Sequence, residues 1–224
     1  MKVYAFTPTL PSDRNVLSEH SVLNQTVKPA VYSLLLERGV GDSLPNRISN
    51  VLNRFFGTVD LEQYDYLLRV DSDTVLPPNF LEENLQQNAD VVGYGHAHII
   101  KISAFKEVMN CRFNSVSDDT YLNFKFMKEG YVWKYWNVKP VMLRRNGCLH
   151  GVKYYLERGN VMWVNGYCPT HVFGSVRWHW KNVVAVFSYF LSMVRRTEQL
   201  DVANYVFRYQ MKKLFNDLTR KRRF

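Results

Sequence analysis

Two aspartates separated by one residue close an apolar stretch about a third of the way along the chain, in the segment Arg69-Val70-Asp71-Ser72-Asp73-Thr74-Val75-Leu76-Pro77-Pro78. In an extended chain alternate side chains lie on one face, so we expect Asp71 and Asp73 to converge on one hard cation through carboxylate oxygens. Mg²⁺ or Mn²⁺ suits such ligands, and a cation shared with phosphate oxygens neutralises the charge that develops on a departing nucleoside diphosphate. A solvated acidic turn is the alternative interpretation, but the apolar run before the pair and the two prolines after it favour the metal site.

The elements that would position this pair alternate between strand and helix. Strands are predicted at residues 3–6, 30–37, 66–70, 89–94 and 131–136, and helices at about 12–27, 47–56, from Pro78, and from Asp118 to Gly130. This alternation predicts an α/β fold with a mixed, mostly parallel sheet flanked by helices, and ligands outside the carboxyl ends of its strands. From about Trp178 the pattern is helical only. We therefore expect a domain over residues 1–176 and a helical, basic and aromatic C-terminal appendage over 177–224.

Composition excludes several classes of protein. With 46% apolar and 15% aromatic residues the chain can bury a core, so it is neither disordered nor fibrous. Its three cysteines are far apart and contain no Cys-x-x-Cys pair, which argues against a disulfide framework and a zinc site and favours a cytoplasmic location. Neither a signal-peptide pattern nor an apolar run of about 18 residues is visible.

The formal net charge of +9, from 29 Lys and Arg against 20 Asp and Glu, predicts an anionic partner such as a nucleotide, a nucleic acid or a membrane surface. The basic clusters lie in the last third of the chain, at Arg144-Arg145, Arg195-Arg196 and residues 220–223. The N-terminal two-thirds is therefore closer to neutral.

The order of these motifs resembles the GT-A fold glycosyltransferases, and within them the family 2 type, over roughly residues 1–150. In that family a strand ends in an Asp-x-Asp motif followed by a short spacer, Pro and a helix, as at Asp71, Asp73, Pro77 and Pro78. Further similar segments are Thr7-Pro8-Thr9 with Arg14, Leu17, Leu23 and Gln25, and Asp118-Asp119 through Gly130. The resemblance implies a Rossmann-like GT-A domain and a metal-dependent, inverting glycosyltransferase. It would move a sugar from a nucleoside-diphosphate-sugar, such as a UDP- or GDP-sugar, to a hydroxyl acceptor on a glycan, lipid or protein.

The same resemblance implies roles for individual residues. Asp119 would be the catalytic base, although helix capping alone also explains both Asp118 and Asp119. The donor's diphosphate would lie at Asp71, Ser72 and Asp73. Its base and ribose would lie at Thr7, Pro8, Thr9 and Glu37. The family commonly shows an Asp-rich turn after the second strand, where this chain has Glu37-Arg38-Gly39-Val40-Gly41-Asp42, so Glu37 or Asp42 would serve, or neither.

Histidine is a further candidate ligand, because imidazole can complete the coordination of Mn²⁺. His150 stands about where many GT-A enzymes supply a third metal ligand, and His171 is its rival. A structural role is the alternative for either. His96 and His98 follow a predicted strand and would line its loop.

The C-terminal segment combines aromatic residues at 178–180, an apolar run at 183–194, and Arg195-Arg196. This pattern suits a helix in a membrane interface, where the enzyme would be peripheral and meet a lipid-linked acceptor, or equally a helix packed on the domain.

Two other functions remain open. A haloacid-dehalogenase-type phosphatase would explain the Asp71-x-Asp73 pair, with Asp118-Asp119 as its distal acidic pair, but such enzymes usually carry the motif on their first strand. A non-enzymatic module binding nucleic acid would explain the charge but not the aspartates at a strand end, so we do not expect a nucleic-acid partner.

Overall fold

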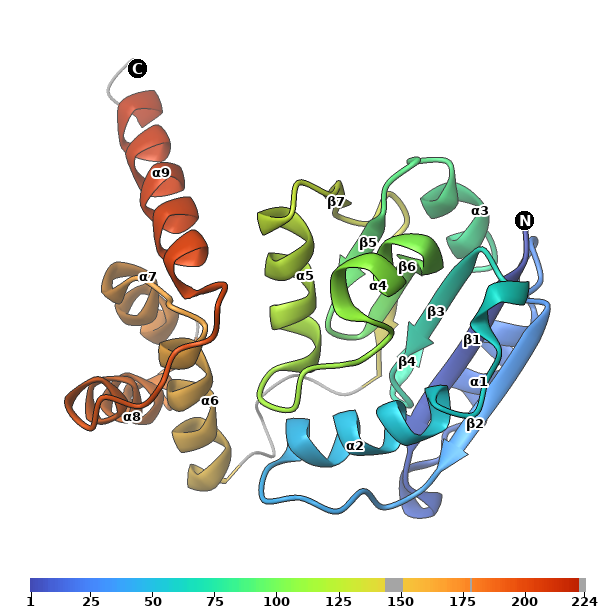
Figure 1. Cartoon of the computed structure of the whole chain (residues 1–224), viewed down its shortest axis with the longest axis horizontal. Helices are drawn as coiled ribbons and strands as arrows, with labels where there is room; N and C mark the ends of the chain where they lie inside the picture. The colour runs from blue at the N-terminus through green and yellow to red at the C-terminus, as the bar shows by residue number, and fades with distance from the viewer. Residues whose placement is uncertain (144–150, 178, 222–224) are drawn as a thin grey trace. The chain divides into compact units, whose positions relative to one another are not determined.

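The computed structural model describes residues 1–143, 151–177 and 179–221, and the chain divides into an α/β unit, Met1–Arg145, and a helical unit, Asn146–Phe224. Figure 1 shows the strands and helices of both units. The α/β unit carries the predicted site.

A six-stranded sheet in the order β2-β1-β3-β6-β5-β7 forms the centre of the α/β unit. Its strands are β1 (Val3–Thr9), β2 (Val31–Leu36), β3 (Tyr66–Val70), β5 (Val91–Tyr94), β6 (Ala97–Lys101) and β7 (Trp133–Lys134). β1 pairs in parallel with β2 and β3, β5 pairs in parallel with β7, and β6 is antiparallel to both β3 and β5. The expected α/β fold with a mixed, mostly parallel sheet is confirmed.

Helices cover both faces of this sheet (Figure 1) because alternate strand residues point to opposite sides. Tyr4 and Phe6 of β1 pack with residues of α2 (Leu44–Phe56), α4 (Ile102–Met109) and α5 (Asp118–Lys128). Val3 and Ala5 pack on the other face with residues of α1 (Val16–Leu23) and α3 (Phe80–Leu85). Short 3-10 turns at Pro11–Asp13 and Leu61–Gln63 and a two-stranded sheet of β4 (Thr74–Val75) and β8 (Val141–Met142) complete the unit.

Three local expectations differ from the structure. β1 continues to Thr9 because Thr7, Pro8 and Thr9 remain in register with β2, whereas we expected the strand to stop at Phe6. The first helix starts later than expected, where the Asn15 side chain accepts a hydrogen bond from the Leu17 N–H. β6 was not predicted at all. It follows a two-residue hairpin at Gly95-His96, where Gly95 has a φ of +56°, the left-handed region that glycine adopts without strain.

The helical unit contains α6 (Val152–Val164), α7 (Pro169–Gly174), the turn Ser175–Arg177, α8 (Asn182–Val194) and α9 (Ala203–Lys221). It begins at residue 146, not at the 176/177 boundary that the sequence suggested, because α6 and α7 pack with α8. Gly159 of α6 has no side chain to separate the two backbones, since a Cβ there would lie 2.1 Å from the Ala185 carbonyl oxygen. The Ser188 hydroxyl then donates to the Leu156 carbonyl at 2.6 Å.

Candidate active site

A pocket of about 370 Å³ lies at the carboxyl ends of β1, β2 and β3, which are neighbours in the sheet. Six of the residues singled out in the sequence line it: Pro8, Thr9, Glu37, Asp71, Ser72 and Asp73. Parallel strands bring their carboxyl ends to one edge of a sheet, which is why residues so far apart in the sequence meet here. Its volume lies within the range of about 300–1,000 Å³ that small-molecule sites occupy.

Two candidates for the donor's base and ribose, Thr7 and Asp42, do not line this pocket, and neither does Asp119. Thr7 lies inside β1 and is only 1% exposed, so its side chain belongs to the interior of the unit. Asp42 is exposed in the loop after β2. Glu37 lines the pocket and forms an ion pair with Arg54, so of the two carboxylates considered for the ribose only Glu37 is in place.

The segment Asp71–Thr74 is a tight turn, in which the Thr74 N–H donates to the Asp71 carbonyl at 3.0 Å. We expected an extended chain with alternating side chains, and this expectation is wrong because β3 ends at Val70 and β4 begins only at Thr74. Both aspartates nevertheless line the same pocket. The Leu143 N–H, just after β8, donates to the Asp73 carbonyl at 2.8 Å and holds the far end of the turn.

A buried arginine connects this turn to the start of α5. Arg69 is 4% exposed; its guanidinium lies 2.5 Å from a carboxylate oxygen of Asp118 and 3.5 Å from one of Asp71. Burial disfavours the charged guanidinium, but the carboxylates of Asp118, Asp71 and Asp119 more than offset this and leave the pKa of Arg69 raised. Arg69 therefore stays charged and links the two acidic motifs.

The two carboxylates of the second acidic pair have different surroundings. Asp118 is the first residue of α5, it is 7% exposed, and burial raises its pKa although Arg69 opposes the shift. It pairs with Arg69 and does not cap α5, which was the alternative role for it, because the cap position belongs to Ser117.

Asp119 is half-exposed, and one of its oxygens accepts hydrogen bonds from the Thr120 N–H at 2.6 Å and the Thr120 hydroxyl at 3.2 Å. The other oxygen faces the β5–β6 hairpin, where a Cβ on Gly95 would lie 3.7 Å from it. Of the pair, Asp119 therefore has the carboxylate that a solvent-borne group can reach.

The β5–β6 hairpin also contacts the Asp71 turn. The Asp71 N–H donates to the His96 carbonyl at 2.9 Å, and the His96 ring nitrogen lies 3.8 Å from an Asp71 carboxylate oxygen. His98 lies opposite Arg69 on β6 and is 1% exposed. Burial, followed by the charge of Arg69, lowers its pKa to about 3, so His98 is neutral beside the arginine. His98 thus belongs to the interior and not to a loop, whereas His96 is at the site.

The residues of the pocket supply part of the ligand set that a hard divalent cation needs. Within the described residues no three His, Cys, Asp or Glu side chains converge as metal ligands. Mg²⁺ commonly binds through one or two carboxylates together with substrate phosphates and water, and Asp71 and Asp73 offer the two carboxylates. His150 lies outside the described residues. His171 is on α7 of the helical unit, where its ring lies 5.1 Å from that of Tyr167.

Sequence reasoning missed the pocket's basic residues. Arg38, Arg47 and Arg69 line it, from the end of β2, from α2 and from β3. The signal for Arg69 was present, since a charged residue inside an otherwise apolar strand is seldom buried without a partner. Its partner, 49 residues away, had no sequence signal.

Comparisons with known proteins identify the fold. No family model matches the sequence, and no curated protein matches it. Among solved structures, the mannosyltransferase PcManGT from Pyrobaculum calidifontis, in complex with GDP-Man and Mn²⁺, superposes with a TM-score of 0.52 at 12% identity, over 92% of this chain and 78% of that one. A197 from STIV matches with a TM-score of 0.42 at 17% identity, over 65% of this chain and 87% of that one. The α/β unit, with its mixed sheet and its pocket at the strand ends, therefore has a GT-A-like glycosyltransferase fold, as the resemblance in the sequence implied.

Proposed function

We propose that the protein is a metal-dependent, inverting glycosyltransferase that takes a sugar from a nucleoside-diphosphate-sugar, such as a UDP- or GDP-sugar. The observation that carries this proposal is the pocket at the ends of β1, β2 and β3, in which Asp71 and Asp73 share one turn. The likeness to a mannosyltransferase solved with GDP-Man and Mn²⁺ supports it.

In this proposal different residues of the pocket hold different parts of the donor. Asp71 and Asp73 would hold Mn²⁺ or Mg²⁺, which when bound neutralises charge on the donor's diphosphate. The base and ribose would lie against Pro8, Thr9 and Glu37, at the ends of β1 and β2. Arg38 and Arg47 would add positive charge beside the phosphates.

The acceptor hydroxyl needs a base, because it is a poor nucleophile at neutral pH. Asp119 would take its proton as the oxygen attacks the anomeric carbon, and the bond from that carbon to the diphosphate oxygen would break on the opposite face. Asp118 is unsuited to this role because its carboxylate is buried against Arg69. The acceptor would be a hydroxyl on a glycan, a lipid or a protein, met in the cytoplasm or at a membrane surface that the helical unit would contact.

The two rival functions fit the structure less well. A phosphatase of the haloacid dehalogenase type would need an aspartate nucleophile after its first strand, whereas Asp71 follows the third strand in chain order. A nucleic-acid-binding module would leave the acidic turn and its pocket without a role. Trapping a phosphoenzyme with beryllium fluoride would favour the phosphatase.

The test is a calorimetric and thermal-shift screen of nucleoside diphosphates and nucleotide sugars, with Mn²⁺ or with excess chelator. A ligand that binds only the folded state raises its stability, so we expect a shift for at least one nucleoside diphosphate that chelation abolishes. Asp73→Asn should lose this shift, whereas Asp217→Asn, an exposed aspartate of the helical unit, should keep it. Undiminished binding in excess chelator would show that the pocket does not use a metal.

A further inference from the structure

The helix α8 has its polar side turned inward. Its buried residues include two serines and an asparagine: Asn182, Ala185, Ser188, Tyr189 and Ser192. The opposite side of the helix is wholly apolar, with Val183 57% exposed, Phe187 64% and Val194 74%. A surface helix of a globular protein normally shows the reverse arrangement. The residues whose burial would stabilise α8 most therefore face outward.

The packing behind this face requires the inward residues to be small. A Cβ on Gly159 would lie 2.1 Å from the Ala185 carbonyl oxygen and 2.7 Å from the Ser188 Cβ, so α6 and α8 approach more closely than larger side chains would permit. Close packing through small residues is typical of helices that have an apolar environment on their outer side. The polar inner side is thus a consequence of the packing, and the apolar outer side needs its own explanation.

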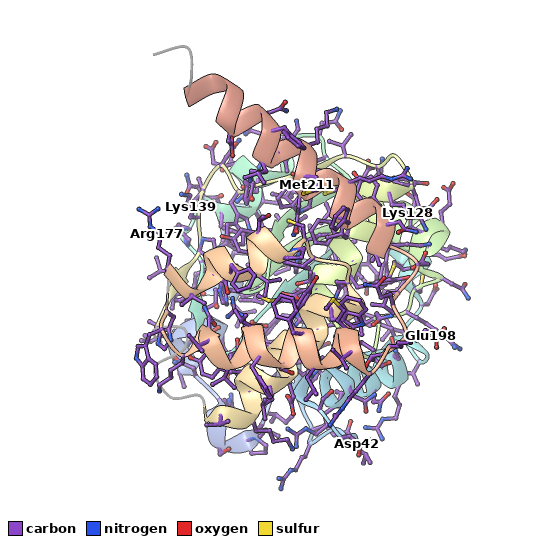
Figure 2. All side chains as sticks on the ribbon, turned by 90° about the vertical axis from the view of Figure 1, so that its left-hand side faces the viewer. Asp42, Lys128, Lys139, Arg177, Glu198 and Met211 are labelled. Atoms are coloured by element: carbon purple, nitrogen blue, oxygen red, sulfur yellow. The ribbon has the colours of Figure 1, made fainter. Side chains whose placement is uncertain are left out.

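The exposed surface extends beyond α8. Trp180, just before the helix, is 73% exposed, and Phe173 on α7 is 56% exposed with its ring 5.5 Å from that of Phe190. We call these side chains together the α8 patch: Phe173, Trp180, Val183, Phe187, Phe190 and Val194. Figure 2 draws the side chains of the helical unit as sticks, among those of the whole chain. A contiguous apolar patch of this kind marks a binding surface.

Basic residues flank the helix of this patch at both ends. Arg177 and Lys181 precede α8, Arg195 and Arg196 follow it, and no charged residue lies between Lys181 and Arg195. Residues 146–224 hold 13 of the chain's 29 Lys and Arg but only 4 of its 20 Asp and Glu, so the whole net charge of +9 belongs to this unit. The partner of the patch must therefore be both apolar and anionic.

We infer that the α8 patch docks the helical unit onto an anionic lipid bilayer, with α8 lying in the plane of the interface. Its 13 residues span about 20 Å, less than the roughly 30 Å of a bilayer core. No helix in the described part of the chain has the length and apolar character that a membrane crossing requires. Val183, Phe187 and Val194 would enter the acyl boundary, Trp180 would lie at the headgroup level, and the arginines would meet the lipid phosphates.

Other occupants fit less well. A second copy of the chain would bring two units of the same net charge of +9 together, and this repulsion opposes a dimer through the patch. A nucleic acid would engage the basic residues but leave the apolar side chains in water. The inference goes beyond sugar transfer and does not depend on it.

The test is cosedimentation of the full chain with vesicles of phosphatidylcholine, with and without phosphatidylserine. We expect binding that requires phosphatidylserine and weakens as salt rises. Val183→Asp should lower the vesicle partition coefficient about tenfold or more, because it removes a buried apolar side chain and adds a charge that the lipid repels.

Val152→Asp is the matched control. Val152 is the first residue of α6 and 64% exposed, so both variants place the same charge in the first turn of a helix at an exposed valine. Circular dichroism establishes that both are folded. Equal vesicle binding by the two variants would overturn the inference, as would absence of binding by the parent. A dimer that Val183→Asp dissociates, or RNA binding without vesicle binding, would assign the surface to another partner.

Discussion

Replacing Arg69 by methionine would leave the carboxylate of Asp118 buried without its cation. Arg69 is 4% exposed and Asp118 7%, and their charged groups are 2.5 Å apart. Removing one partner of a buried ion pair costs about 3–5 kcal/mol, because the remaining charge has neither water nor counter-ion. Against a typical unfolding free energy of about 5–15 kcal/mol, this loss is large. His98 does not replace the lost cation, since burial, the larger of the two causes that lower its pKa, acts on it in the variant as well.

The cost of Arg69→Met should depend on pH. Burial already raises the pKa of Asp118, and Arg69 is the main influence that opposes this shift, so the variant's pKa rises further. A group whose pKa is higher in the folded state binds its proton more tightly there. The deficit in the unfolding free energy of the variant should therefore be small below about pH 4, where Asp118 is protonated in both the folded and the unfolded state. This deficit should grow as the pH rises through the folded-state pKa of Asp118 in the variant. Asp71 and Asp119, which also face Arg69, add to the deficit in the same direction.

Urea unfolding followed by circular dichroism at a series of pH values measures this prediction. The double variant Arg69→Met with Asp118→Leu is the control, since an apolar pair of similar volume is often as stable as the buried ion pair that it replaces. We expect the double variant to recover most of the loss and its pH dependence. A deficit under about 1 kcal/mol at neutral pH, or one that is equal at all pH values, would refute the buried pairing of Arg69 with Asp118.

Two further substitutions test the site and the helical unit. Asp119→Asn should lower the rate of sugar transfer about 10²- to 10⁴-fold with little change in donor affinity, measured by steady-state kinetics and calorimetry. Its control, Asp118→Asn, should chiefly lower stability, and an Asp119→Asn enzyme with the parental rate would exclude Asp119 as the base. Gly159→Ala should destabilise the helical unit by about 1–3 kcal/mol, because its Cβ would meet the Ala185 carbonyl at 2.1 Å. Gly174→Ala, whose Cβ meets nothing within 4 Å, should be close to neutral, and equal thermal midpoints for the two would contradict the close packing of α6 on α8.

Much of the α/β unit was predictable because its strands are short apolar runs bounded by polar residues. β3 has the predicted bounds, Tyr66–Val70, since Asp65 and Asp71 flank a buried run. Placing Thr9, Glu37 and Asp71 at strand ends was sufficient to bring them to one pocket, because parallel strands share an edge.

What the sequence could not supply depends on contacts between distant residues. β6 reverses direction and pairs with both β3 and β5, and nothing in its five residues specifies a strand between those two. The partner of Arg69 is fixed by the packing of α5 on the sheet, and the local pattern at Asp118 was equally compatible with helix capping. The extent of the helical unit was also missed, because the small residues that join α6 to α8 carry no apolar periodicity.

The arrangement of charge at the end of β3 supports the proposal that metal and donor bind together. Asp71 and Asp73 share a turn, and Asp118 and Asp119 begin α5, with Arg69 between these two acidic motifs. Arg69 is already paired closely with Asp118 and is 3.5 Å from Asp71, so its single positive charge cannot also offset Asp73 and Asp119. In the proposed function a diphosphate entering this pocket meets the carboxylates of Asp71 and Asp73, although Arg38 and Arg47 also line the pocket. A divalent cation between carboxylates and phosphates converts that repulsion into attraction. Because coupling between two ligands is reciprocal, the factor by which the metal raises donor affinity must equal the factor by which the donor raises metal affinity.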